Sequence, residues 1–574
     1  MFDVDITREN KTSFAQPIAE NIWRAKYQYQ TASGAIDQTL EDTWRRIADG
    51  LSEVEPEDNR KNVANEIFDA ISGFQLLPAG RILAGCGTTR NVTLSNTFVM
   101  RTIPDTVSGI MDTIKEAALT MQMGGGLGYD FSTIRPRGAL VRGLDCPAAG
   151  PVAAMEICDA VCKMLVTGMG RGAMMGTMRC DHPDIEDFVI AKSDRSRLRN
   201  FNLSVMITDA FMEAVKADGP WDLRWDGVVT RTIPAKGLWE KIMRQNYVAA
   251  EPGVLFIDRI NDLNPMRYAE TISATNSCAE QPLPPFGTCP LASINLAQLV
   301  AAPFTADARL DHSALRRLTA TAVRMLDNTI DVSKYALPEQ HDMAQAQRRI
   351  GLGVTGVADA IAMLGTKYGS PKAAFLLGSW MQLIQNEAYR ASALLAAERG
   401  SFPMYNAERH QENAMVQALD TDVQALISAH GLRNATLTTI APTGTISMLA
   451  GNVSSGIEPI FSTSFLRTIT NPDGSKSMER VTDYAVWRYG QIAGPNAPLP
   501  DVFVTAADLS PEDHVNMQAA AQMWVDSGIS KTVNCPEDIP FEDFKGVYQA
   551  AYDRGCKGCT TYRPNAVTGA VLST

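Results

Sequence analysis

The stretch Thr275-Asn276-Ser277-Cys278-Ala279-Glu280-Gln281-Pro282-Leu283-Pro284-Pro285 carries the most informative pattern in this 574-residue chain. Asn276, Cys278 and Glu280 stand two positions apart, so an extended backbone would point all three side chains to one side. The prolines behind them exclude a helix and stiffen a loop. An amide, a thiol and a carboxylate that could act as a general base would then meet one small ligand. The alternative is a surface loop that happens to hold a cysteine.

A second stretch has the composition of a phosphate-binding turn. The apolar, β-branched run 434–440 leads into Ala441-Pro442-Thr443-Gly444-Thr445-Ile446-Ser447, and then into an expected helix. Backbone N–H groups at a helix start favour phosphate, and the hydroxyl groups add donors. The alternative is an ordinary helix N-cap that uses Thr443 or Thr445.

Composition narrows the class of protein. Apolar residues make up 45% and charged residues 20% of the chain, as in a folded globular protein. A net charge of −12 argues against nucleic acid as a partner. No run of about 18 apolar residues predicts a membrane span. The N-terminus is acidic and lacks the apolar core of a signal peptide, so we expect no export. The ten cysteines therefore indicate cytoplasmic thiols rather than a disulfide framework. The six histidines show no ligand spacing, so we expect no metal site.

The order of elements predicts an α/β fold. Residues 1–75 have a helical pattern, residues 201–207 read as a strand, and 313–336 and 371–398 read as long helices. Such alternation implies largely parallel strands, and 470–500 reads as a surface excursion. The Gly-x-Gly-x-x-Gly pattern at 351–356 has no strand before it, so it predicts a close-packed turn rather than a dinucleotide site.

The loop around Cys278 is followed by Gln-Pro-Leu-Pro-Pro. Together they resemble the active-site finger loop of adenosylcobalamin-dependent (class II) ribonucleotide reductases, particularly the dimeric diphosphate reductases. Further blocks resemble the same family in the same order, over roughly residues 15 to 570: 124–138, 171–174, 182–185, 287–296, 529–534 and 555–558. The adjacent Tyr-Tyr pair of the iron-dependent class and the Arg-x-x-Gly-Tyr context of the glycyl-radical class are missing from the sequence. The resemblance to class II enzymes, together with the missing motifs of the other two classes, indicates adenosylcobalamin as the cofactor. The Asp-x-His-x-x-Gly motif of other cobalamin enzymes is not expected, because class II reductases do not use it.

The resemblance implies a fold with three parts. A helical region (1–75) would pack outside a ten-stranded α/β barrel (76–565), built from two parallel five-stranded halves with the finger loop at its centre, and a short tail (566–574) would follow. Cys278 would become a thiyl radical and remove the 3′-hydrogen of a ribonucleoside di- or triphosphate. Glu280 would take the 3′-hydroxyl proton, and Asn276 would hydrogen-bond the ketyl radical.

The resemblance also assigns binding residues. Pro442, Thr443, Gly444, Thr445, Ile446 and Ser447 would hold the substrate phosphates, and Ser95, Asn96 and Gly126 would contact the rest of the substrate. A deoxynucleotide or ATP effector would bind at the interface of a homodimer through Asp105, Arg171, Arg197 and Asn200. No ATP-cone is evident, so we expect no control of overall activity by ATP and dATP.

One departure from the family concerns the reductive step. Relatives reduce the substrate with a cysteine pair; Cys289 matches one member, but the Ser-Asn-Cys-Phe-Val block reads Ser95-Asn96-Thr97-Phe98-Val99. Thr97 cannot form a disulfide. Cys86 could substitute, or a thiol, a thioredoxin-like protein or formate could supply the electrons, or the radical could serve non-reductive ribose chemistry.

Two other readings stay open. Cys556 and Cys559 form a Cys-x-x-Cys pair that is either redox-active or simply lines the barrel. The whole chain could also be a non-catalytic nucleotide-binding homologue, although Asn276, Cys278 and Glu280 are all present, which argues against it.

Overall fold

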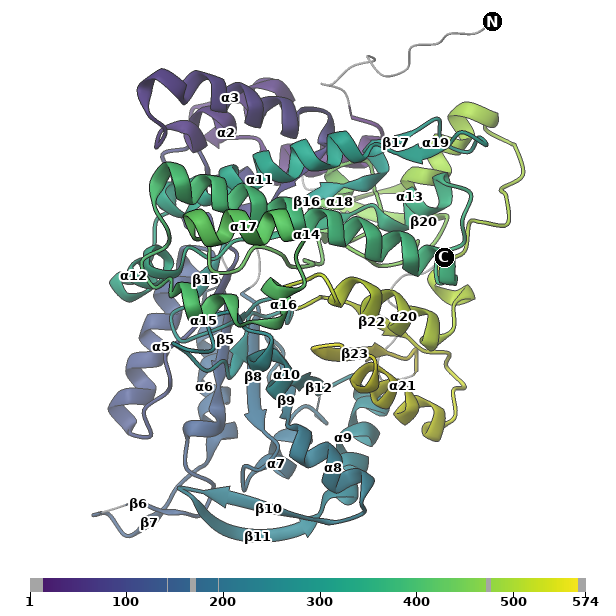
Figure 1. Ribbon diagram of the computed structural model, residues 1–574. Helices are drawn as coiled ribbons and strands as arrows, with labels where there is room; N and C mark the ends of the chain where they lie inside the picture. Colours follow the sequence, from purple (N-terminus) through teal and green to yellow (C-terminus); the bar gives the residue numbers. More distant parts are fainter. Residues whose placement is uncertain (1–13, 142, 166–171, 195, 471–475, 566–574) are drawn as a thin grey trace, which may run out of the picture.

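The computed structural model describes residues 14–141, 143–165, 172–194, 196–470 and 476–565 (Figure 1). The N-terminal region comprises α1 (Pro17–Ile22), the π-helical turn η2 (Trp23–Tyr27), a β1–β2 hairpin (Gln30–Thr31, Gly34–Ala35), α2 (Leu40–Ser52) and α3 (Glu57–Ile71). A capping box between Thr39 and Asp42 starts α2. The expected helical character of this region is present.

Five parallel strands form the first half of the barrel. They pair in the order β4 (Thr97–Val99), β5 (Gly126–Asp130), β8 (Met174–Arg179), β9 (Phe201–Ile207) and β12 (Gly253–Phe256). Parallel neighbours need crossover connections, and α5 (Val107–Gln122), α6 (Pro151–Met164) and α9 (Ala235–Ala249) lie in them. These elements occupy the lower part of Figure 1.

The second half is also parallel but less regular. It contains β15 and β16 (Thr288–Cys289, Leu291–Asn295), β19 (Gly351–Thr355), the segment 436–440, β22 (Thr532–Asn534) and β23 (Gly558–Tyr562). The segment 436–440 forms one parallel bridge with each neighbour, Leu352 to Thr438 and Ile440 to Ile529, and accepts two more backbone hydrogen bonds, from the N–H groups of Ile350 and Ser527. The carboxylate of Asp526 accepts the N–H groups of Leu437 and Thr438, at 2.8 and 3.2 Å, so these donors do not enter a regular ladder.

The two halves meet at both edges. β23 pairs antiparallel with β12, and β15 pairs antiparallel with β4. With the single bridges included, the pairings therefore pass through ten segments and return to β4, which confirms the expected architecture of two parallel five-stranded halves. The ring is completed by bridges rather than by continuous sheet.

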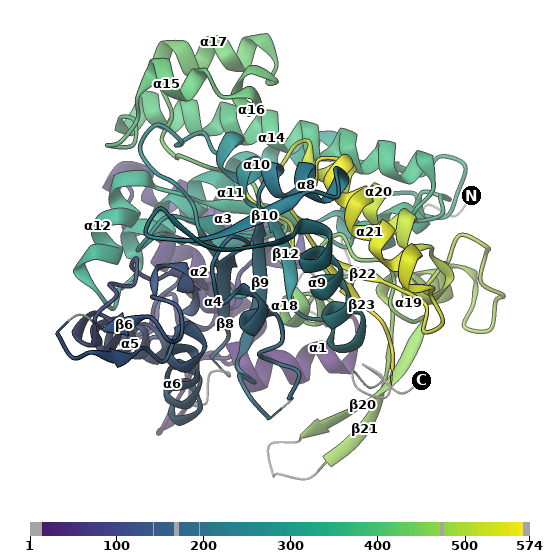
Figure 2. The same ribbon diagram turned by 90° about the horizontal axis from the view of Figure 1, so that it is seen from below.

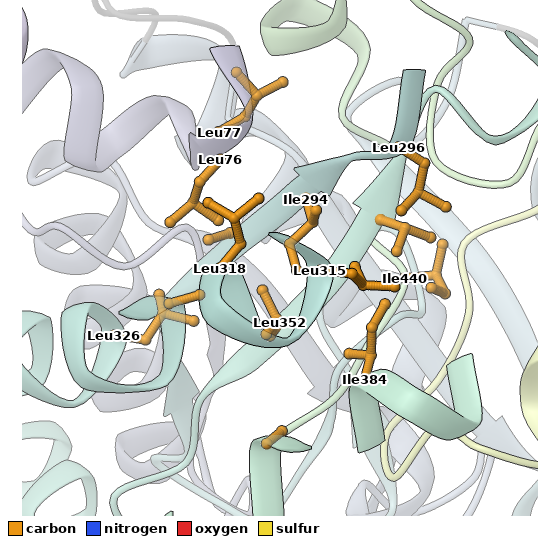
Figure 3. Close-up of a cluster of buried hydrophobic side chains, with 14 of the residues drawn as sticks. Leu76, Leu77, Ile294, Leu296, Leu315, Leu318, Leu326, Leu352, Ile384 and Ile440 are labelled. Atoms are coloured by element: carbon orange, nitrogen blue, oxygen red, sulfur yellow. The ribbon is translucent and has the colours of Figure 1, made fainter. Parts of the chain in front are cut away.

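The largest core joins the N-terminal helices to the second half of the barrel. Around α11 (His312–Val332) and α14 (Pro371–Arg399), buried side chains from β3 (Leu76–Pro78), β16 and β19 interdigitate (Figure 3). Leu76, Ile294, Leu315, Leu352 and Ile384 have no exposed surface. The N-terminal helices therefore share one core with the barrel instead of forming a detached unit.

Two local predictions need adjustment. Residues 351–355 form a barrel strand rather than a turn; its glycines admit the neighbouring segment, because a Cβ on Gly353 would lie 2.2 Å from the carbonyl oxygen of Thr439. The excursion at 470–500 includes a hairpin of β20 (Ser464–Thr470) and β21 (Lys476–Thr482), which projects from the body in Figure 2, and α19 (Tyr484–Ala493). None of the helices in the described part of the chain has the length and apolar character of a membrane span.

Candidate active site

The finger loop is a closed turn inside the barrel. Short strands β13 (Ala274–Thr275) and β14 (Pro282–Leu283) pair antiparallel at its base. The side-chain oxygen of Asn276 accepts the N–H of Gln281 at 3.0 Å, and the N–H of Asn276 donates to Gln281 at 3.0 Å. The backbone is thus not extended as predicted, but Asn276, Cys278 and Glu280 still line one cavity, because the turn is too tight to separate them.

Strands of both halves hold the loop. Its Glu280 carbonyl accepts the Thr439 hydroxyl and the Gly528 N–H, each at 2.8 Å, from the second half. From the first half, Asn202 donates to the Ser277 carbonyl at 2.7 Å. A Cβ on Gly128 would lie 1.7 Å from the carbonyl oxygen of Thr275, so only glycine fits under the loop there.

Cys278 lies where two cavities meet. Cavity A, about 840 Å³, is lined by Asn276, Cys278, Glu280, Thr97 and residues 441–446. Cavity B, about 690 Å³, is lined by Cys278 and by residues of β9, β12 and β23. Both volumes lie in the ~300–1,000 Å³ range of small-molecule sites. One sulfur atom can therefore face two different ligands.

The surroundings keep Cys278 protonated. Part of the Cys278 surface is exposed to the cavities. Desolvation by the surrounding protein nevertheless raises the pKa of the thiol to about 12, and the Glu280 carboxylate adds a smaller contribution. The S–H bond therefore persists at neutral pH. Such a sulfur suits hydrogen-atom transfer better than nucleophilic or metal-binding chemistry, which require the thiolate.

Glu280 is poised for proton transfer. The side chain is 3% exposed, and its burial raises the pKa of the carboxyl to about 7, while a hydrogen bond from the Asn276 side chain partly opposes that rise. Its Oε2 atom has no partner among the described residues. A carboxyl that titrates near neutrality, with one oxygen free, can accept a proton from a ligand in cavity A.

Thr97 stands directly opposite Cys289 in the β4–β15 pair. Its hydroxyl donates to the Cys289 carbonyl at 2.7 Å and is almost fully buried. The Cys289 thiol is buried and contacts the Pro290 carbonyl at 3.6 Å, and burial raises its pKa. The structure thus brings positions 97 and 289 together, but only position 289 carries a sulfur, whereas a disulfide would need a sulfur at both.

The loop 441–447 is built on a cluster of hydroxyl groups. Thr443 occupies the N-cap position of α18 (Gly444–Leu449), but its side chain makes no cap hydrogen bond. Its hydroxyl instead contacts those of Thr355 (2.9 Å) and Ser447 (2.8 Å), and it accepts the Gly456 N–H. Among the described residues, the N–H groups of residues 444–446 have no backbone acceptor, and these residues line cavity A. Ser447 lies behind this wall and supports Thr443.

The other predicted substrate residues divide between two places. Asn96 lines cavity A, and its carbonyl accepts the Gly126 N–H at 2.8 Å. Gly126 lines a smaller cavity C, about 160 Å³, beyond Ser277. Ser95 is buried behind the wall, where its hydroxyl accepts that of Thr288 at 2.7 Å.

The predicted effector residues lie around α5 and α6. Asp105, just before α5, pairs with Arg135 at 2.8 Å. Arg197 pairs with Glu156, and the Asn200 N–H donates to Asp159 at 2.9 Å, both on α6. Arg171 lies outside the described residues.

The remaining cysteines are away from cavity A. Cys86 is buried against α2, with its sulfur 3.7 Å from the Ile47 carbonyl. Cys556 and Cys559 are buried at β23; Cys559 lines cavity B. Within the described ranges, no three histidine, cysteine or acidic side chains are grouped as a metal site.

Several residues of the site give no signal in the sequence. Thr355, Thr439 and Gly528 support the two loops from distant strands, and Arg81 lines cavities A and C. No motif marks them, because their roles depend on which strands become neighbours.

The comparisons agree with this geometry. Residues 95–562 match the family model described as ribonucleotide reductase, barrel domain, and residues 13–91 match ribonucleotide reductase, all-alpha domain. The chain is 36% identical to a vitamin B12-dependent ribonucleoside-diphosphate reductase of Mycobacterium tuberculosis (strain CDC 1551 / Oshkosh), over 97% of this chain and 80% of that protein. It is 35% identical to the vitamin B12-dependent ribonucleoside-diphosphate reductase of Thermoplasma acidophilum, over 97% of this chain and 72% of that protein.

Proposed function

Since this chain belongs to the ribonucleotide reductase family, we propose that it converts ribonucleotides to 2′-deoxyribonucleotides. The reaction would use adenosylcobalamin and a thiyl radical on Cys278. The observation that carries the proposal is the position of Cys278 between cavities A and B. Cavity A would take the ribonucleotide and cavity B the cofactor.

The walls of cavity B suit the nucleoside part of this cofactor. Gln518 lines the cavity, and its Oε1 atom is a buried acceptor without a partner among the described residues. The adenosyl group carries N–H and O–H donors that such an acceptor can bind. Gln518, Asn452 and Ser530 are the residues that would hold the group. When bound, adenosylcobalamin supplies the radical by cleavage of its cobalt–carbon bond.

The chain's own residues would then direct the chemistry in cavity A. The Cys278 sulfur, once it has lost its hydrogen atom, takes the 3′-hydrogen of the ribose. Glu280 accepts the 3′-hydroxyl proton on its free Oε2, and Asn276 keeps the carboxylate and the loop in place. Loss of the 2′-hydroxyl as water leaves a radical that needs two electrons and two protons before Cys278 returns its hydrogen atom.

Thr97 determines where those electrons come from. Because position 97 has no sulfur, Cys289 cannot close a disulfide across the β4–β15 pair. We propose that an external thiol supplies the second sulfur, since cavity A has exposed residues, Arg24 and Lys26, on its wall and thus opens to solvent. The Cys289 thiol and the external thiol would together give the substrate two electrons and two protons and would be joined in a mixed disulfide, which a second external thiol then reduces.

Substrate phosphates would bind at residues 442–446. The free N–H groups of 444–446 and the hydroxyl of Thr445 are donors on the wall of cavity A. The similar proteins are named diphosphate reductases, so a ribonucleoside diphosphate is the proposed substrate.

Homodimerisation would use α5 and α6. Both helices carry exposed apolar side chains, with Val107 78% and Met164 74% exposed, in addition to Met111 and Leu119. Exposed apolar side chains on two neighbouring helices favour a protein interface. Asp105 directly precedes α5 and Arg197 pairs with α6, so a deoxynucleotide or ATP effector would bind beside this face.

Introducing charge on this face should separate the protomers. We expect the double variant Val107→Glu/Met111→Glu to dimerise at least about 100-fold more weakly, because an interface would bury two unpaired carboxylates. Sedimentation velocity over a concentration series measures the change. Val228→Glu, on the exposed β11 strand (Val228–Pro234), is the matched control. A wild-type chain that stays monomeric at high concentration contradicts the dimer.

Turnover should depend on pH through Glu280. Only the carboxylate accepts a proton, so kcat should rise as pH increases through the pKa of about 7. Glu280→Gln should lower kcat by about 10²- to 10⁴-fold and remove this rise, whereas Glu280→Asp should retain a pH-dependent rate. A wild-type rate that is constant between pH 6 and 8 would contradict the role of Glu280.

Product analysis tests the proposed function. The chain is incubated anaerobically with adenosylcobalamin, each ribonucleotide and dithiothreitol, and the reaction is repeated without thiol and with formate. A 2′-deoxynucleotide formed only with thiol supports the proposal, and one formed with formate alone would support reductase activity but replace the external thiol. Ribose that is isomerised without reduction would show that the radical serves other chemistry.

A further inference from the structure

Arg81 lies on the wall that cavities A and C share, and no anion of the described residues pairs with it. It lies in the first turn of α4 (Gly80–Gly85), where its backbone N–H contacts the Asn96 side-chain oxygen at 3.4 Å. Its side chain lines cavity A and the smaller cavity C. Asn96 thus links the position of Arg81 to the wall that both cavities share.

The guanidinium lies against a glycine-rich backbone. Gly124 has a φ of +101°, and a Cβ there would lie 2.8 Å from the Arg81 Cζ atom and 2.9 Å from Nη1. Any side chain at 124 would therefore displace the guanidinium. The glycines at 124–126 give this cation a fixed place on the cavity wall.

No anion in the described part of the chain faces this group. The other cations of cavity A differ: Arg24 pairs with Glu20, Arg90 donates to the carbonyls of Ala84 and Gln30, and Lys26 is exposed to solvent. Within the described residues the Arg81 side chain makes no hydrogen bond or ion pair, and burial lowers its pKa, with only a smaller opposing contribution from Tyr27. Arg81 is half-buried, and a guanidinium that is partly removed from water without acceptors is unfavourable, so its donors are available for a ligand.

The position of the ligand's parts follows from the proposed function, on which this inference rests. Phosphates at 442–446 and a ribose over Cys278 and Glu280 leave the base to occupy the end of cavity A that continues past Ser277 into cavity C. None of residues 441–447 lines cavity C. Its volume of about 160 Å³ is close to that of an engineered cavity of about 150 Å³ that binds benzene, so cavity C would take one ring of a base and cavity A the rest of the nucleotide.

We propose that Arg81 binds the base of the substrate at the acceptor that all four bases share. Arginine offers donors only. Purine N3 and pyrimidine O2 lie in equivalent places next to the glycosidic bond, and both are acceptors. A donor-only group beside the ribose site therefore binds each of the four bases without selecting among them, and leaves discrimination to other parts of the protein.

A binding cycle with one altered atom tests the assignment. Calorimetry measures ADP and 3-deaza-ADP, in which a carbon replaces N3, without cofactor and with excess dGTP to fill any second nucleotide site. Wild type should bind 3-deaza-ADP roughly 10- to 100-fold more weakly than ADP, as expected for loss of a hydrogen bond to a charged group. Arg81→Gln should bind ADP more weakly by a similar factor and should no longer distinguish the two nucleotides.

Arg90→Gln is the matched control, because it removes a cation from the same cavity whose donors are already bound to carbonyls. Arg90→Gln should keep the wild-type preference for ADP over 3-deaza-ADP. If Arg81 had only a structural effect, Arg81→Gln would keep that preference as well. Equal wild-type affinity for the two nucleotides, or an unchanged preference in Arg81→Gln, overturns the inference while the proposed function stands. Failure of wild type to bind either nucleotide overturns both.

Discussion

Replacing Cys278 with serine is expected to abolish deoxynucleotide formation, with a loss of at least about 10⁴-fold, as is typical when a residue that carries the chemistry is removed. A hydroxyl has nearly the size of a thiol, but its O–H bond does not yield a hydrogen atom readily. The pKa of about 12 already keeps Cys278 protonated, so the variant changes the radical chemistry and not the charge of the site.

Binding should survive this substitution. The loop is held by backbone contacts at Ser277 and Glu280, so Cys278→Ser should bind ribonucleotide with wild-type affinity in calorimetry. Cys86→Ser, which alters a cysteine buried against α2, is the control and should retain turnover. Substantial deoxynucleotide production by Cys278→Ser would show that the radical resides elsewhere.

Replacing Thr97 with cysteine should increase turnover driven by a dithiol, by at least about tenfold. Directly opposite residues of an antiparallel pair lie about 4.5–5.5 Å apart at Cα, within the ~4.4–6.8 Å range of disulfides. Residues 97 and 289 are such a pair. A second thiol in place would replace an intermolecular encounter with an intramolecular one.

Thr97→Ser is the matched control, because it keeps a hydroxyl and should leave the rate near that of wild type. After one turnover without external thiol, Thr97→Cys should form about one deoxynucleotide per chain and lose two free thiols, as counted by mass spectrometry after alkylation. An unchanged rate and no disulfide would mean that the pair is not the source of electrons in this chain.

The sequence by itself determined the family, the parallel two-half fold and the nature of the reactive groups. The finger-loop motif is local, and its prolines and alternating polar residues restrict the backbone wherever it lies. Strand 201–207 and the long helices α11 and α14 were predictable because their periodicity is a local property. The replacement at Thr97 was also visible in the sequence, since it needs only alignment with a motif.

Only the tertiary structure decided how these groups work together. Cys278 adjoins two cavities because strands separated by hundreds of residues close around one turn, and Glu280 has a pKa near 7 because that closure buries it. Arg81 has no partner because no carboxylate of the described chain reaches it. Burial and the lack of a partner depend on which distant segments become neighbours, and no spacing along the chain records that.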